Sequence, residues 1–298
     1  MSGNLTALNS SSISGASPQI RISDGVDSDL TVLGDVTLEN SHTDGSSIMY
    51  LGVNGGTIVH GNLNVYDNST SVYSRFSLLL NEISSLRVEG TTTIENNSIA
   101  DDSRMYLNSR GQATFNGPVI LRNNGGTNLS GMYLNHFPES LNEFNENIVV
   151  ECTVANSDGV RFGEGAGFAR LSDTKTISVG PNNFISGDLR LRNFTQLGPT
   201  AQNLELNGES RLYLYGSIFN GPLTTKSPRI LIQENLFQSP VDFEKTGITN
   251  DASLGMNRFN SNVTFRNSGT DYFMTSNTLP NDYNADVSYI QTLSLIHI

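Results

Sequence analysis

Four aspartates near the amino terminus form an acidic cluster that could in principle bind a metal ion. Asp24, Asp27, Asp29 and Asp35 lie close together, and carboxylate oxygens at short spacing are ligands that Ca²⁺ prefers. The spacing differs from the Asp-x-Asp-x-Asp-Gly pattern of an EF-hand loop, and the nonapeptide repeat of calcium-binding β-rolls is absent. Two interpretations remain, a weak calcium site and a solvated acidic cap, and we favour the cap.

Other carboxylates could in principle cleave a polysaccharide. Glycoside hydrolysis needs two carboxyl groups about 5–9.5 Å apart. The acidic residues in the middle of the chain occupy no fixed place in the repeat described below, so we predict no catalytic residues and no cofactor. These scattered residues are Asp101, Asp102, Glu139, Glu143, Glu146, Glu151, Glu164, Asp173 and Asp188.

The cysteine and the histidines likewise give no indication of a catalytic or metal-binding site. Cys152, the only cysteine, lies in a run of alternating apolar residues (148–154), which predicts an ordinary buried thiol and disfavours a reactive one. The histidines are isolated, and neither a zinc-binding spacing nor a His/Ser/Asp arrangement emerges. They are His42, His60, His136 and His297.

The charge balance excludes two classes of partner. Lys and Arg number 17 against 29 Asp and Glu, and the net charge is −12. The sequence therefore lacks the basic patch that nucleic acids and acidic membrane surfaces require. The apolar runs, such as residues 78–80, are far shorter than the roughly 20 residues that span a bilayer. We predict no nucleic-acid partner and no membrane span.

The elements that would position any site are set by an internal repeat, apolar-x-Gly-x-apolar-x-apolar. In weaker copies Glu, Ser or Ala replaces the glycine. The copies begin at Val32, Val59, Val88, Phe115, Phe144, Ile185, Phe219, Phe237, Phe259 and Tyr283. Their spacing is uneven and widest on either side of Ile185, as in a solenoid array with insertions.

A second motif fixes the register of the first half. It occupies residues 49–52, 78–81, 105–108 and 132–135, for example Met105-Tyr106-Leu107-Asn108. In the first three copies its last residue precedes the repeat glycine by the same distance, and in the fourth copy this distance is slightly longer. Two motifs at a fixed offset indicate one repeating structural unit.

Apolar residues alternate within each short run, and Gly, Asn, Asp or Ser bounds each run, which indicates short strands with one buried face. We predict an all-β fold, a right-handed parallel β-solenoid (β-helix) with irregular rungs of about 18–29 residues. An array of antiparallel sandwiches is the less favoured alternative. The predicted core is Val36, Leu38, Leu63, Val65, Ile94, Phe115, Val119, Leu121, Val150, Cys152, Leu189, Leu191, Phe219, Phe259, Val263 and Phe265.

Two local features refine this expectation. Phe76, Leu79, Leu80 and Ile83 have helical spacing, so residues 76–83 could form a short inserted helix, although the repeat register favours a strand. Asparagines that follow the strands could bond to one another along the axis, because an amide both donates and accepts. These are Asn40, Asn68, Asn97, Asn123, Asn193 and Asn267.

We divide the chain into a polar segment (residues 1–29), the solenoid (30–292) and an end (293–298) that resembles a translated sequencing adaptor. A genuine apolar tail is the alternative for that end. The amino terminus does not resemble a signal peptide. We expect the native chain to continue at one or both ends, and the last rung, after Tyr283, to be bare because no polar cap follows it.

Several segments resemble long repetitive surface proteins of Bacteroidetes, namely residues 114–117, 175–180, 189–196 and 244–247. The resemblance covers roughly residues 30–290 and implies a β-helical, adhesin-like protein exported by the type IX route. It supplies no catalytic residues.

We expect a non-catalytic spacer or adhesin stalk in a secreted or cell-surface protein, with carbohydrate or surface ligands as possible partners. The alternative is a carbohydrate-active β-helix enzyme, either a polysaccharide lyase or a glycosidase. Its mark would be three or more charged side chains that meet in a groove on neighbouring rungs.

Overall fold

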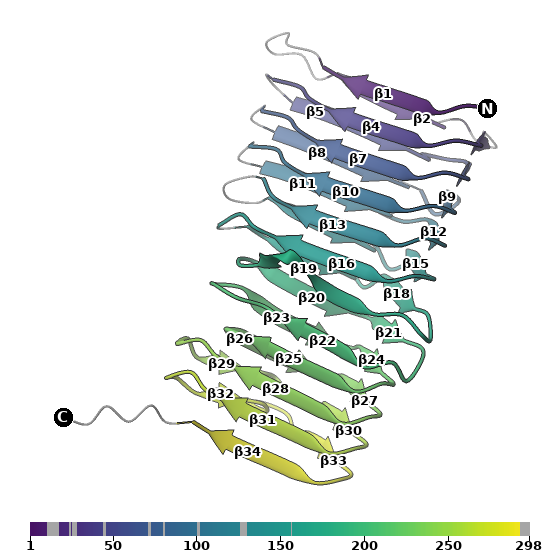
Figure 1. The fold of residues 1–298 in the computed structure, drawn as a ribbon. Coiled ribbons are helices and arrows are strands. Elements are labelled where there is room, and N and C mark those ends of the chain that lie inside the picture. Colours follow the sequence, from purple (N-terminus) through teal and green to yellow (C-terminus); the bar gives the residue numbers. More distant parts are fainter. Residues whose placement is uncertain are drawn as a thin grey trace.

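Short strands and polar turns stack into one long parallel coil in the computed structural model (Figure 1). The structure describes residues 1–10, 18–23, 25, 29–43, 46–70, 73–79, 81–99, 102–125, 130–155 and 157–292. Every secondary-structure element in these residues is a strand, and every strand pair is parallel, which excludes the antiparallel alternative. In Figure 1 the near strands run from right to left as the turns descend from the N-terminus, so the coil is right-handed as predicted.

From the first turn to β26, the turns each contribute one strand to each of three sheets. Sheet A contains β1 (Leu5–Asn9), β4 (Val36–Asn40), β7 (Leu63–Asp67), β10 (Thr92–Asn96), β13 (Val119–Asn123), β16 (Ile148–Cys152), β19 (Ile177–Phe184), β22 (Gln202–Glu205), β25 (Leu223–Ser227), β28 (Val241–Lys245), β31 (Val263–Asn267) and β34 (Val287–Gln291).

Sheet B contains β2 (Gln19–Ile22), β5 (Ser46–Leu51), β8 (Tyr73–Leu78), β11 (Asp102–Leu107), β14 (Gly131–Leu134), β17 (Gly159–Phe162), β20 (Asp188–Arg192), β23 (Arg211–Tyr215) and β26 (Arg229–Gln233). Two short strands, β29 (Asp251–Ala252) and β32 (Phe273–Met274), pair separately after β26.

Sheet C contains β3 (Leu30–Val32), β6 (Gly56–Val59), β9 (Ser85–Val88), β12 (Gln112–Phe115), β15 (Leu141–Phe144), β18 (Phe168–Leu171), β21 (Phe194–Gln196), β24 (Ile218–Phe219), β27 (Leu236–Phe237), β30 (Arg258–Phe259) and β33 (Asp282–Tyr283).

The interior is a stack of like side chains, because parallel pairing places equivalent residues of successive turns beside each other. All sixteen predicted core residues are buried, none more than 2% exposed. Phenylalanines from sheet C stack along the axis, with ring centroids 5.7 Å apart for Phe219 and Phe237 and 4.9 Å for Phe237 and Phe259. The predicted register of this sheet is therefore confirmed at these positions.

Two spacings of the predicted repeat were wrong. The long gaps on either side of Ile185 contain ordinary turns, because Phe144 pairs with Leu171, and Gln196 pairs with Phe219. One of these turns escapes the apolar repeat pattern because a polar residue stands where the pattern expects an apolar one. Gln196 takes a core position, and its buried side-chain oxygen accepts a hydrogen bond from the Gly221 amide at 3.2 Å.

The second motif was also misaligned in one copy. Phe76, rather than Leu78, pairs with Met49, so the predicted alignment slips along the strand. The turn after Leu78 is correspondingly longer, and Leu79 takes the left-handed corner position (φ 53°) that Gly52 takes one turn earlier. The proposed helix is absent, because Tyr73–Leu78 is strand β8 and Ile83 is exposed; Leu80 lies outside the described residues.

Asparagines bond to one another along the axis as predicted, and they do so in two separate columns. The inner column lies in the core, where Asn9 donates to Asn40, Asn40 to Asp67 and Asn96 to Asn123, each at 3.1 Å. The outer column contains Asn68, Asn97 and Asn124, which lie one residue further along the chain. Asn193 lies outside both columns, and its amide donates to the backbone carbonyl of Ala166. Asn267 takes the strand-end position next to Lys245 in sheet A, and its amide donates to the backbone carbonyl of Asp271.

The solenoid begins before residue 30, since β1 and β2 form part of the first turn. At the other end, β34 pairs with β31, and residues 293–298 lie outside the described residues. The turn lengths vary as predicted, and a short one runs from Leu223 to Val241. The turn from Leu5 to Val36 is longer than the predicted range allows, so that range is slightly too narrow.

Candidate functional site: the arginine and tyrosine face of sheet B

The outer surface of sheet B has a composition unlike that of the whole chain. Residues alternate along each strand, so that in β23 Leu212 and Leu214 are buried while their neighbours face outward. The chain has 17 basic residues, of which three are lysines and fourteen are arginines. Eight of the fourteen arginines lie at these outward positions. We call the following set the Arg/Tyr face: Arg21, Tyr50, Arg75, Arg104, Tyr106, Tyr133, Arg161, Arg190, Arg192, Arg211, Tyr213, Tyr215 and Arg229.

Arginines lie over tyrosines of adjacent turns along this face. The guanidinium carbon of Arg75 is 4.8 Å from the centroid of the Tyr106 ring, and that of Arg190 is 5.0 Å from the centroid of Tyr213. Tyr106 also stacks on Tyr133 at 5.2 Å. Cation–π contacts of this kind contribute about 0.5–1 kcal/mol at exposed sites and more where water is excluded. The contacts therefore join successive turns outside the core.

Three carboxylates join the arginines in the middle of the face. Arg211 donates to both oxygens of Asp188 at 2.7 Å, and Arg190 reaches Asp188 at 3.0 Å and Glu164 at 2.8 Å. Arg161 bonds Asp158 at 3.0 Å. The acids enter from β20 and from the turns on either side of β17, so the repeat brings together residues that are far apart in sequence.

The arginines also set the titration of Asp188. Burial by itself would raise the pKa of this carboxyl group, but the hydrogen bonds and charge of Arg211, together with the charges of Arg161 and Arg190, hold the pKa below its ordinary value. Nearby, burial and the 2.5 Å hydrogen bond to Asp158 raise the pKa of the Tyr133 hydroxyl. Asp188 is therefore an ionised partner of arginine rather than a proton donor.

The sequence alone points to few of these residues. Glu164 and Asp188 look scattered in it, because their shared position emerges only when the turns are aligned. No local motif in the sequence marks the arginines as members of one face. His136 is isolated in the sequence, yet its ring packs 5.0 Å from that of Tyr106 at the edge of the face, and burial lowers its pKa.

Of the four aspartates considered as calcium ligands, two lie in the described residues. Asp29 and Asp35 each accept a backbone N–H of the next turn, from Gly56 at 2.9 Å and from Asn62 at 2.7 Å. Asp24 and Asp27 lie outside the described residues. Among the described residues, no cluster of three or more His, Cys, Asp or Glu is placed to hold a metal ion.

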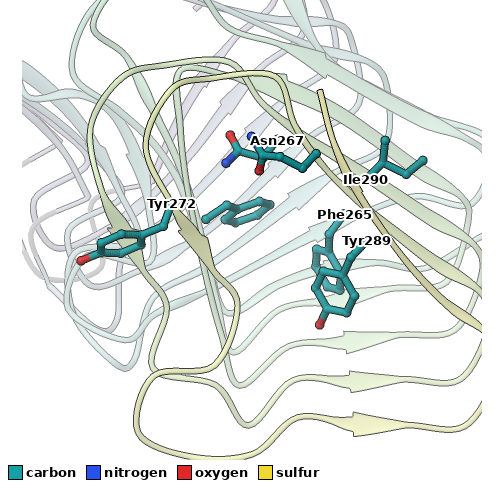
Figure 2. A pocket seen from close by; sticks show the side chains of 7 residues that line it. Phe265, Asn267, Tyr272, Tyr289 and Ile290 are labelled. Carbon is teal, nitrogen blue, oxygen red and sulfur yellow. The ribbon is translucent and has the colours of Figure 1, made fainter. Parts of the chain in front are cut away.

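A hollow of about 260 Å³ lies at the carboxyl-terminal end (Figure 2). Figure 2 shows the rings of Phe265 and Tyr289 one over the other, with Tyr272 across the opening. Tyr289 is 63% exposed, whereas Phe265 in the preceding turn is 2% exposed. Within the described residues, this ring of the last turn is therefore far less covered than its counterpart in the turn before it.

Comparison with protein-family models, with curated proteins and with solved structures finds no match to this chain. The fold defines it as a β-solenoid. The part of the chain that the structure describes contains no helix long and apolar enough to cross a membrane.

Proposed function

We propose that this solenoid is a non-catalytic structural segment, a spacer or adhesin stalk, of a secreted or cell-surface bacterial protein. The observation that supports this role best is the pairing on the Arg/Tyr face. The carboxylates that meet there, those of Asp158, Glu164 and Asp188, are each bound by an arginine of the same face. The charges thus tie adjacent turns together.

Such a pairing differs from what polysaccharide hydrolysis requires. A glycosidase keeps one carboxyl group protonated by raising its pKa, so that the group can protonate the leaving oxygen. The arginines shift the pKa of Asp188 in the opposite direction. This charged cluster is therefore better suited to stiffening the coil than to acid catalysis.

The remainder of the structure supports the same role. Each turn of a solenoid contacts only its neighbours, so stability grows with the number of turns and length can be extended without a central site. The polar outer column of Asn68, Asn97 and Asn124 adds hydrogen bonds between turns on another face. The acidic, lysine-poor composition and the resemblance to bacterial surface proteins favour an extracellular or cell-surface location.

A carbohydrate-active enzyme is the second candidate, because charged side chains from neighbouring turns do converge on the Arg/Tyr face. Incubation of the protein with plant, algal and bacterial polysaccharides separates the two functions. The structural role predicts no release of reducing or unsaturated ends. Release of such ends by the wild type, and its loss in Asp188→Asn, would establish the enzyme instead.

A further inference from the structure

A cleft of about 580 Å³ opens at the start of β26, where the connections between sheets A and B change length. A single residue, Pro228, joins β25 to β26, whereas longer loops (206–210 and 246–250) join the corresponding strands of the turns on either side. The short connection leaves a notch between the two longer loops. Gly247 closes its floor, since its amide bonds the Pro228 carbonyl at 3.0 Å and a Cβ there would lie 2.3 Å from that oxygen.

Arg229 lines this cleft, and part of its guanidinium group is available to bind a ligand. Its Nε donates to Asp251 at 3.2 Å, and the Asp251 side chain is fully buried, which fixes the direction of the guanidinium. Within the described chain, the two terminal nitrogens of Arg229 make no hydrogen bond to protein, and 37% of the side chain is exposed. Arg211, the preceding residue of this column, instead uses both Nε and one terminal nitrogen to bind Asp188.

The surroundings of Arg229 suit a sugar acid. A guanidinium with a free edge matches the geometry of a carboxylate, and Lys245, the nearest buried cation, is occupied by the backbone carbonyls of Gly247 and Asp271. Glu209 and Thr249 line the same cleft and can bond sugar hydroxyls. The Glu209 side chain can accept a hydrogen bond from a sugar hydroxyl.

A smaller hollow continues the surface along the same strand. Tyr213, Leu231 and Gln233 line it, and the outward residues of β26 (229, 231 and 233) follow in a row roughly 13 Å long at about 3.3 Å per residue. Tyrosine offers a flat apolar surface with a polar tip, and Gln233 offers an amide for hydroxyl groups. One end of the row is cationic and the other end is apolar and amidic.

We propose that these two hollows form a binding site for a carboxylate-bearing oligosaccharide, with the sugar acid at Arg229 and the adjoining sugar rings over Tyr213 and Leu231. The site adds a specific ligand class to the proposed structural role and requires no catalysis. A protein without this binding site could still act as a spacer, so failure of this proposal would leave the proposed structural role intact.

Isothermal titration calorimetry with trigalacturonate, and with neutral galactotriose as the reference, tests the site. We expect trigalacturonate to bind the wild type and galactotriose to bind at least tenfold more weakly. Arg229→Lys keeps the charge but loses the two-pronged contact, and should weaken trigalacturonate binding by about tenfold. Arg266→Lys is the matched control, because Arg266 also pairs through Nε with an aspartate but lies on sheet A, and it should bind as the wild type does.

A second variant avoids any dependence on the buried Asp251. Ile248 is 73% exposed in the loop that lines the cleft, so Ile248→Glu should leave folding unchanged and abolish trigalacturonate binding through repulsion. The proposal is overturned if trigalacturonate does not bind the wild type, or if it binds both cleft variants as tightly as the wild type. Equal binding of a sulfated galacto-oligosaccharide or of a triglutamate peptide would also overturn it, since the ligand class would be wrong. Chain cleavage in the polysaccharide assay would refute the structural role without touching this binding test.

Discussion

Arg211 on β23 holds Asp188 on β20 through two hydrogen bonds of 2.7 Å across adjacent turns. Only 6% of the Asp188 side chain is exposed, and the carboxylate also bonds Arg190. Charge-assisted bonds of this two-pronged form are stronger than neutral ones and fix geometry as well as energy. The pair therefore holds two adjacent turns together in the middle of the Arg/Tyr face, outside the core.

Replacement of Asp188 by asparagine should lower the free energy of unfolding by about 2 kcal/mol, because the arginines lose their anionic acceptor. The measurement is urea unfolding at pH 7. Asp282→Asn is the matched control, since its contact with Arg258 is 3.5 Å long and both side chains are about 60% exposed. That exposed pair should contribute almost nothing. Equal effects of the two changes would contradict a structural role for the Arg/Tyr face.

The contribution of Asp188 should also depend on pH. Its pKa is lowered in the folded protein, so the folded state favours the ionised form, and this stabilisation is present above the unfolded value of about 3.9. It is lost as the pH falls through the lower, folded value. The difference in unfolding free energy between wild type and Asp188→Asn should be constant from pH 7 to 5 and shrink below about pH 4. If this difference in unfolding free energy instead grew in acid, the pKa of Asp188 would be raised, not lowered, in the folded protein.

The inner and outer asparagine columns should differ sharply in their effect on stability. Asn123 is buried and donates to the Ser157 hydroxyl at 2.6 Å, so Asn123→Ala leaves buried polar groups unpaired and should cost about 1–3 kcal/mol. Asn124 is its exposed neighbour in the outer column, and Asn124→Ala should change stability by less than about 0.5 kcal/mol. Thermal unfolding of the two variants provides the comparison, and similar losses would show that the two columns are energetically equivalent.

The sequence was sufficient to predict most of the fold, and the reasons are visible in particular residues. Alternating pairs such as Val36 and Leu38 carry the strand period, and stacking in register repeats that pattern in every turn. Prediction failed where a turn departs from the average. Gln196 fills an apolar position by making its own hydrogen bonds, and Leu79 takes a corner conformation that glycine or asparagine usually takes.

The candidate site was harder to predict than the fold. Glu164, Asp188 and Arg211 are unremarkable in the sequence, because no local motif links them and their contacts depend on the alignment of three turns. The turns there are unequal, since the one from Gly159 to Asp188 is longer than the one from Asp188 to Arg211. A search at one fixed period therefore places these residues in different columns.

The phenylalanine stack should dominate the stability of the second half. Phe237 is fully buried and packs against Phe219, Phe243 and Phe259. Phe237→Ala should therefore cost about 3–5 kcal/mol through lost transfer energy and an unfilled cavity. Phe168→Ala is the control, because this residue of sheet C is 52% exposed, and it should cost much less. Chemical denaturation of both variants tests the difference, and a small loss in Phe237→Ala would mean that the stack can collapse around the gap.

Cys152 should report on unfolding through its reactivity. The thiol is fully buried at the end of β16; burial raises its pKa to about 11, although a hydrogen bond involving Ser157 opposes the shift. The neutral thiol is thus favoured in the folded state, and this stabilisation is present below the unfolded value of about 8.5 and lost as the pH rises toward the folded value. At pH 8 the native protein should resist an aromatic disulfide reagent and react once unfolded in urea. The wild type should also lose more stability than Cys152→Ala between about pH 8.5 and 11, and rapid labelling of the folded protein would show that the thiol is accessible.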